Sequence, residues 1–203
     1  MGADAVELDV RRSSDGHLVV HHDPRLADGR NIVETARRDL PDHVPGLGEA
    51  LDACTGMWVN VEIKNDPTEP DFDPDESVAA DVARVLLGRG DPHRYLVSSF
   101  RRETIDALRR ATTVVPTAWL TIGIPEPDMA AVLDSLVADG HCALHPWVAT
   151  LTSDLVDACH QRGISVNTWT CDDSQRMAEL VSWGIDGICT NVPDVALDVL
   201  RSR

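Results

Sequence analysis

Residues 5–10 read Ala5-Val6-Glu7-Leu8-Asp9-Val10, an apolar strand pattern that carries two carboxylates. Because successive strand side chains point to opposite faces, Glu7 and Asp9 share one face and the apolar residues share the other. The stretch Trp58-Val59-Asn60-Val61-Glu62-Ile63-Lys64 repeats this pattern, with Glu62 and Lys64 on a common face at its C-terminal end. If the two strands are neighbours, three acids and one base converge.

The segment His21-His22-Asp23-Pro24 lies between these strands, directly after the apolar run Leu18-Val19-Val20. Carboxylate oxygens suit a hard divalent cation, Mg²⁺ or Ca²⁺, and an imidazole nearby suits proton transfer. His22 is the candidate for that role, whereas strand alternation sends His21 to the opposite face.

Each candidate also has a simpler interpretation. Glu7 and Asp9 could face solvent from a half-exposed strand, Glu62 and Lys64 could form a salt bridge, and His22 could cap a turn. Parallel strands are usually buried on both faces, and a buried carboxylate without a partner costs several kcal/mol. We therefore favour metal ligation by the three acids.

Composition narrows the classes of partner. The 203 residues include 18 Lys+Arg and 34 Asp+Glu, for a formal net charge of −16, which repels nucleic acid and anionic membranes. A small phosphorylated substrate stays compatible if a metal and local cations offset that charge. The five scattered cysteines predict reduced, mostly buried thiols, and the absence of a signal segment or apolar span predicts a cytoplasmic protein.

Helical and strand patterns alternate along the chain and predict one domain over residues 1–203. After the strand at 58–64 comes an acidic, proline-rich loop at 66–75, and strands then follow at 95–100, 114–120, 142–145, 164–170 and 187–190. Helices are expected at 48–54, 77–87, 103–111, 127–138, 153–162, 174–183 and 195–200.

Seven strands separated mostly by helices indicate a parallel α/β sheet, either open and doubly wound or closed into a barrel. No GxGxxG follows the first strand, which disfavours a dinucleotide fold. A TIM (β/α)8-type barrel explains why polar residues and aromatic residues follow strand ends, since these ends meet at one mouth. The residues at these ends are Glu7, Asp9, Glu62, Lys64, Phe100, His145 and Trp169.

Motifs along almost the whole chain resemble those of the glycerophosphodiester phosphodiesterase family. They agree in order and spacing, and comprise residues 2–10, Asp15-Gly16, Val19-Val20-His21-His22-Asp23, Val61-Glu62-Ile63-Lys64, Ser98-Ser99-Phe100, Val166-Asn167-Thr168-Trp169-Thr170 and residues 184–193. The resemblance implies a TIM barrel that binds one divalent cation and hydrolyses glycerophosphodiesters to an alcohol and glycerol 3-phosphate, in lipid metabolism.

The resemblance implies a role for each residue of this chain that matches a family motif. Glu7, Asp9 and Glu62 become metal ligands, and His22 becomes one of two histidines that act as general acid and base. Lys64 becomes a phosphate contact. Phe100 and Trp169 become walls of the substrate site.

The family also opens with a His-Arg-Gly strand followed by a helix, and the 203 residues contain no such motif. The expected barrel therefore lacks its first strand and helix in this chain. Two functions follow: a metal-dependent phosphodiesterase with an N-terminally truncated sequence, or a catalytically impaired domain that binds cation and phosphoester without turnover. An open barrel edge would also favour self-association.

Overall fold

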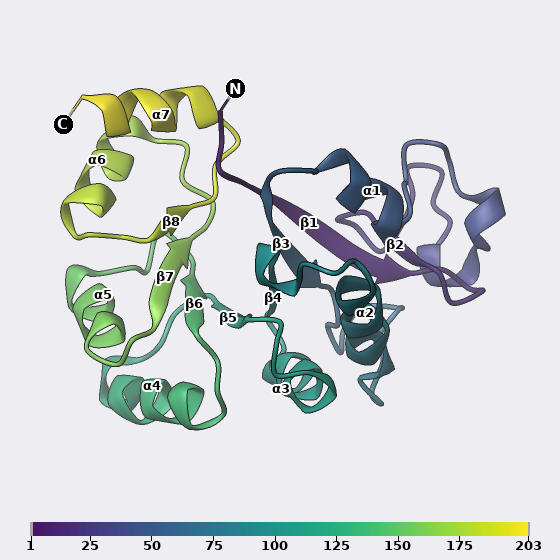
Figure 1. Ribbon diagram of the computed structural model, residues 1–203, viewed down its shortest axis with the longest axis horizontal. Coiled ribbons are helices and arrows are strands. Elements are labelled where there is room, and N and C mark those ends of the chain that lie inside the picture. Colours follow the sequence, from purple (N-terminus) through teal and green to yellow (C-terminus); the bar gives the residue numbers. More distant parts are fainter. Residues whose placement is uncertain (1, 203) are drawn as a thin grey trace. The chain divides into compact units, whose positions relative to one another are not determined.

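The computed structural model describes residues 2–202, which form two compact units. One unit comprises residues 5–117, and the other comprises residues 2–4 together with residues 118–202. Figure 1 follows the chain through both in sequence order.

The sheet of unit 5–117 has the strand order β2-β1-β3-β4. The four strands are β1 (Ala5–Arg12), β2 (Leu18–Val20), β3 (Trp58–Ile63) and β4 (Tyr95–Ser99). β1, β3 and β4 are parallel to their neighbours, and β2 pairs antiparallel with the end of β1. The carboxyl ends of the three parallel strands therefore meet at one edge.

Three helices cover one face of this sheet: α1 (Leu47–Ala53), α2 (Ser77–Gly88) and α3 (Arg102–Ala111). Figure 1 shows α2 and α3 side by side below the strands. Apolar strand residues such as Val10, Val61 and Val97 pack in one buried cluster with Leu51, Leu86 and other helix residues. Because alternate strand residues fill this core, the polar residues between them project from the opposite face.

The segment after β2 is stabilised by a small cluster of its own. Two short 3₁₀ helices, Ile32–Glu34 and Arg37–Asp39, replace regular structure there. The cluster consists of five buried residues, Val19, Leu26, Ile32, Leu40 and Val44. The loop that carries His21 and His22 is therefore part of a packed substructure.

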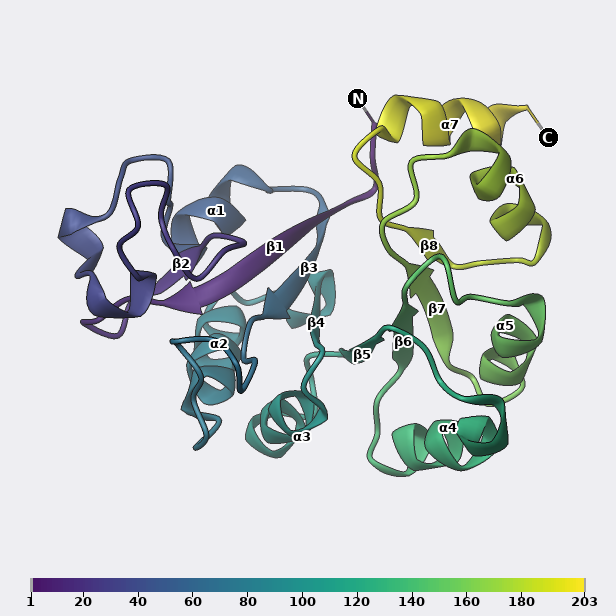
Figure 2. The same ribbon diagram turned by 180° about the vertical axis from the view of Figure 1, so that it is seen from behind.

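The second unit repeats the alternation of strands and helices. Its strands are β5 (Thr117–Thr121), β6 (Ala143–Pro146), β7 (Ser165–Thr168) and β8 (Gly187–Ile188), in that order in the sheet. Its helices are α4 (Met129–Ala138), α5 (Ser153–His160), α6 (Ser174–Ser182) and α7 (Pro193–Arg201). Figure 2 shows these helices following one another along one side of β6, β7 and β8.

The predicted alternation agrees with the observed elements. Within residues 2–202, all seven predicted strands are present, and the short β2 is an additional, antiparallel strand. β1 runs to Arg12, beyond the predicted end at Val10, because β2 pairs with its last three residues. β5 begins at Thr117, later than predicted, directly after a proline that has no N–H to donate to a sheet.

Two further sequence-based expectations concern cysteines and membranes. Of the five cysteines, Cys54, Cys159 and Cys171 are buried, and Cys142 and Cys189 are exposed. No helix within residues 2–202 is both long and apolar enough to cross a membrane.

Candidate metal centre

The parallel pairing of β1 and β3 brings the acidic residues together. Their register sets Glu7 beside Asn60 and Asp9 beside Glu62. Residues opposite each other in parallel strands share a face, so the polar face of β1 continues onto β3. One carboxylate oxygen from each of Glu7, Asp9 and Glu62 lies within 4.8 Å of the other two.

Burial makes this cluster electrostatically unfavourable without a cation. Burial, together with the charges of Asp9 and Glu62, raises the pKa of Glu7 from 4.5 to about 8, although Lys64 opposes the shift. Burial also raises the pKa of Glu62, against the effect of Lys64. Such shifts are typical of acids held together for a function.

Lys64 provides one positive charge beside the three carboxylates. It follows β3 directly, and its Nζ lies 3.0 Å from Asp9 Oδ1 and 2.7 Å from Glu62 Oε1. Burial disfavours the charged ammonium, but the ion pairs with Glu62 and Asp9 outweigh burial and raise the pKa of Lys64. Lys64 therefore stays protonated and binds two of the three acids.

The residues present fit a divalent cation. Glu7 Oε1 is buried and has no hydrogen-bond partner within residues 2–202. Three ionised carboxylates and one lysine leave a net charge of −2, which one divalent cation would balance. All of the donor atoms are carboxylate oxygens, which Mg²⁺ and Ca²⁺ prefer.

His22 lies in the loop that follows β2. The backbone N–H of its neighbour His21 donates to the Asp9 carbonyl at 3.0 Å, which attaches the loop to β1. His22 Nδ1 lies 2.7 Å from Asp23 Oδ1, and this hydrogen bond lowers the pKa of Asp23. A charged His22 would lower the pKa of Glu62, so the imidazole acts within electrostatic range of the cluster.

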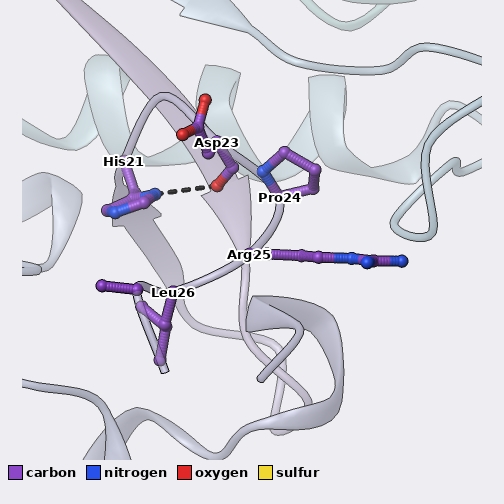
Figure 3. Close-up of a pocket in the computed structure, with 6 residues that line it drawn as sticks. His21, Asp23, Pro24, Arg25 and Leu26 are labelled. Carbon is purple, nitrogen blue, oxygen red and sulfur yellow. Dashed lines mark hydrogen bonds between the residues drawn. The ribbon is translucent and has the colours of Figure 1, made fainter. Parts of the chain in front are cut away.

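A shallow pocket of about 470 Å³ lies in the same loop. Figure 3 shows the His21 ring turned toward the carbonyl of Asp23, which lies 2.7 Å from its Nδ1. His21 thus bonds within its own turn, and the exposed ring of His22 is not among the groups that line this pocket. The lining residues are His21, Asp23, Pro24, Arg25, Leu26 and Ala27.

The two predicted aromatic walls belong to different units. Phe100 directly follows β4, in the unit that holds the acids, and is 42% exposed. Trp169 follows β7 in the other unit, where its Nε1 donates to the His145 carbonyl at 2.8 Å. His145 is buried, which lowers its pKa to about 4, and its ring bonds to Asn167.

Two polar residues near the acids were not singled out from the sequence. Asn60 shares the face of Glu62, and its Nδ2 donates to Ser98 Oγ at 3.0 Å. Arg11 shares the face of Glu7 and Asp9, and only 1% of it is exposed. In the sequence, the two-residue period of the strand already places Arg11 on the same face as Glu7 and Asp9.

The acidic loop at 66–75 is held by cations from β1. Arg11 Nη1 contacts Glu69 Oε2 at 2.8 Å and Asp71 Oδ2 at 2.7 Å. Arg12 Nη2 contacts Asp73 Oδ2 at 3.0 Å. Glu69, Asp71 and Asp73 are thus paired with arginines of the same unit.

Comparisons with known proteins show one consistent likeness. The model of the glycerophosphoryl diester phosphodiesterase family matches residues 1–195. A glycerophosphodiester phosphodiesterase of Caldanaerobacter subterraneus is 25% identical over 99% of this chain and 87% of its own length. Another, from Bacillus altitudinis, is 28% identical over 98% of this chain and 86% of its own length.

Solved structures show the same likeness in the fold. A phosphodiesterase from Oleispira antarctica, solved with its product sn-glycerol-3-phosphate, superposes with a TM-score of 0.86 at 22% identity. The match covers 98% of this chain and 86% of that one. The prediction of a TIM-type α/β barrel fold is confirmed by these likenesses.

Proposed function

We propose that this chain, which belongs to the glycerophosphoryl diester phosphodiesterase family, hydrolyses glycerophosphodiesters to an alcohol and glycerol 3-phosphate with the help of one divalent cation. The observation that carries the proposal is the group of three carboxylates within 4.8 Å of one another. Further support comes from the relatives with the same activity in their names and from the structure with bound sn-glycerol-3-phosphate.

Glu7, Asp9 and Glu62 would hold the cation, either Mg²⁺ or Ca²⁺. When bound, the cation supplies positive charge that stabilises the growing negative charge on the phosphate oxygens. Lys64 adds a second positive charge beside the same acids and is the residue proposed to contact the phosphate. Phe100 and Trp169 are proposed to border the substrate.

His22 is proposed to move the proton. Its Nδ1 bonds to Asp23, which orients the ring and leaves Nε2 directed away from that contact. As a general acid, Nε2–H would give its proton to the oxygen of the leaving alcohol as the P–O bond breaks. As a general base, neutral Nε2 would instead take a proton from the attacking oxygen. A single imidazole cannot do both in the same step, so full turnover requires a second acid or base.

The first test measures cation binding by thermal unfolding. Mg²⁺ or Ca²⁺ should raise the melting temperature, because a ligand that binds only the folded state stabilises it. Glu62→Gln should abolish the shift, since it removes one ligand charge. Asp42→Asn removes the same charge from an exposed carboxylate and should keep the shift. No cation response in the unaltered chain would contradict the metal site.

The second test measures turnover of glycerophosphocholine and glycerophosphoethanolamine, followed by release of glycerol 3-phosphate. The 203-residue chain should hydrolyse them slowly or not at all, and adding an upstream His-Arg-Gly strand should raise the rate by about 10²- to 10⁴-fold. His22→Ala should remove that gain. Cation binding without turnover in either form would favour the second candidate, a domain that binds cation and phosphoester.

A further inference from the structure

Arg11 is a buried cation on β1 whose side chain contacts two other segments of unit 5–117, the acidic loop at 66–75 and the loop that carries His22. It lies on β1, on the face of Glu7 and Asp9, with 1% of its side chain exposed. A buried charge is tolerated only when it is paired and hydrogen-bonded. One side of the guanidinium meets this need through Glu69 and Asp71, at 2.8 and 2.7 Å from Nη1.

The other side of the same guanidinium binds the backbone of His22. Nε donates to the His22 carbonyl oxygen at 2.9 Å, and Nη2 donates to the same oxygen at 2.6 Å. Within residues 2–202, the other hydrogen bond that His22 makes is from its ring to the adjacent Asp23. The His22 side chain is 72% exposed and the Asp23 side chain is 70% exposed, so side-chain packing contributes little to the position of His22.

The planar fork of arginine suits this arrangement. Two parallel N–H groups fix both the distance and the direction of the acceptor, whereas an ammonium would fix the distance alone. Glu69 and Asp71 in turn accept from Nη1, and Glu69 Oε1 also lies 3.3 Å from Nη2, so the plane of the guanidinium cannot rotate freely. The backbone carbonyl of His22 is therefore held in a fixed position relative to β1, the strand that carries Glu7 and Asp9.

We propose that Arg11 is a positioning residue, which sets the place of the His22 imidazole relative to the acidic cluster through the His22 carbonyl. The inference rests on the proposed role of His22 in proton transfer. Arg11 contacts neither the proposed cation ligands nor the reacting atoms in this arrangement. Its loss should therefore lower kcat and leave cation affinity and KM nearly unchanged.

The test compares Arg11→Lys and Arg11→Met with the matched control Arg12→Met. Arg12 is the next residue on β1 and pairs with Asp73 of the same acidic loop, without contact to His22. The combination of Arg11→Met, Glu69→Gln and Asp71→Asn leaves no unpaired charge in this cluster and covers the case in which Arg11→Met does not fold. All variants are made in the form that carries the upstream His-Arg-Gly strand.

Two readouts separate positioning from general stability. The first is the ¹⁵N spectrum of the His22 imidazole, which reports its tautomer and surroundings and does not depend on turnover. The second is the split between kcat and KM for glycerophosphocholine. We expect the Arg11 variants to shift the His22 resonances and to lower kcat by about 10²-fold, the scale of a 1 Å misplacement. Cation affinity, measured by calorimetry, should change less than twofold.

The outcomes distinguish this inference from the proposed function. Wild-type His22 resonances and kcat in folded Arg11→Lys and in the triple variant would overturn the positioning role, as would equal losses in Arg12→Met. If the form that carries the upstream strand and no other change binds no cation and hydrolyses no substrate, the proposed function itself is contradicted. In that case the His22 resonances still decide whether Arg11 positions the loop.

Discussion

At the scale of single residues, the protonation of Glu7 governs how the acidic cluster responds to pH. The pKa of Glu7 is about 8 in the folded chain, against an ordinary value of 4.5. Between these two values the folded state holds a proton that the unfolded state has lost. The free energy of unfolding contributed by this group therefore falls as the pH rises from 4.5 to about 8.

Glu7→Gln tests this directly, because glutamine carries no titrating proton. In the presence of chelator, the melting temperature of the variant minus that of the unaltered chain should increase as the pH rises through this window. Above pH 8 the difference should level off. Thermal unfolding at pH 5, 6, 7, 8 and 9 measures it, with Asp42→Asn as the control for a change in net charge. Parallel curves for Glu7→Gln and the unaltered chain would show that Glu7 is ionised throughout.

At the scale of elements, the connection from β3 to α2 depends on one buried amide. Asn65 is 4% exposed and follows β3 and Lys64 directly. Its Nδ2 donates to the Asp73 carbonyl at 3.1 Å and to Glu76 Oε2 at 2.8 Å, and its Oδ1 accepts from the Asp73 backbone N–H at 2.8 Å. Both ends of the acidic loop are thus joined next to the proposed phosphate contact.

Asn65→Ala should destabilise the chain by about 2–4 kcal/mol, since it leaves the buried Asp73 backbone N–H without its acceptor and removes the hydrogen bonds to the Asp73 carbonyl and to Glu76. Urea unfolding measures the loss. Thr68→Ala removes an exposed hydroxyl that bonds within the same loop, to Asp66, and should cost well under half as much. If the two variants unfold at similar urea concentrations, the loop is held by other contacts.

At the scale of the whole molecule, the net charge of −16 opposes the approach of an anionic substrate. Salt screens this repulsion, since the Debye length falls from about 30 Å at 0.01 M to about 8 Å at 0.15 M. With the cation saturating, KM for the anionic glycerophosphoglycerol should fall as ionic strength rises over this range. Glycerophosphocholine has no net charge, so its KM should change much less. Equal salt dependence for the two substrates would show that local charges at the site dominate.

Two predictions about the whole chain remain to be measured. Residues 2–202 form two compact units, and the sequence predicts that they belong to one phosphodiesterase-like domain. Self-association over an open barrel edge is likewise a prediction, which light scattering of the purified chain would test.

The sequence by itself determined the elements and the identity of the acidic residues. Alternation of apolar and polar residues is a local property, so it located the strands at Ala5 and Trp58 and assigned Glu7, Asp9 and Glu62 to polar faces. The order of motifs then indicated the family, which the comparisons show. Strand boundaries were less accurate, because pairing partners such as β2 decide where a strand ends.

The tertiary structure alone decided how those residues interact. The register of β1 on β3 sets Asp9 beside Glu62, and burial raises the pKa of Glu7. Neither follows from a local pattern, since both depend on packing between segments far apart in the chain. Arg11 shows this most clearly, because Glu69 lies 58 residues away and His22 is bound through its backbone carbonyl. A backbone acceptor has no signature in the sequence, so only the folded chain reveals this contact.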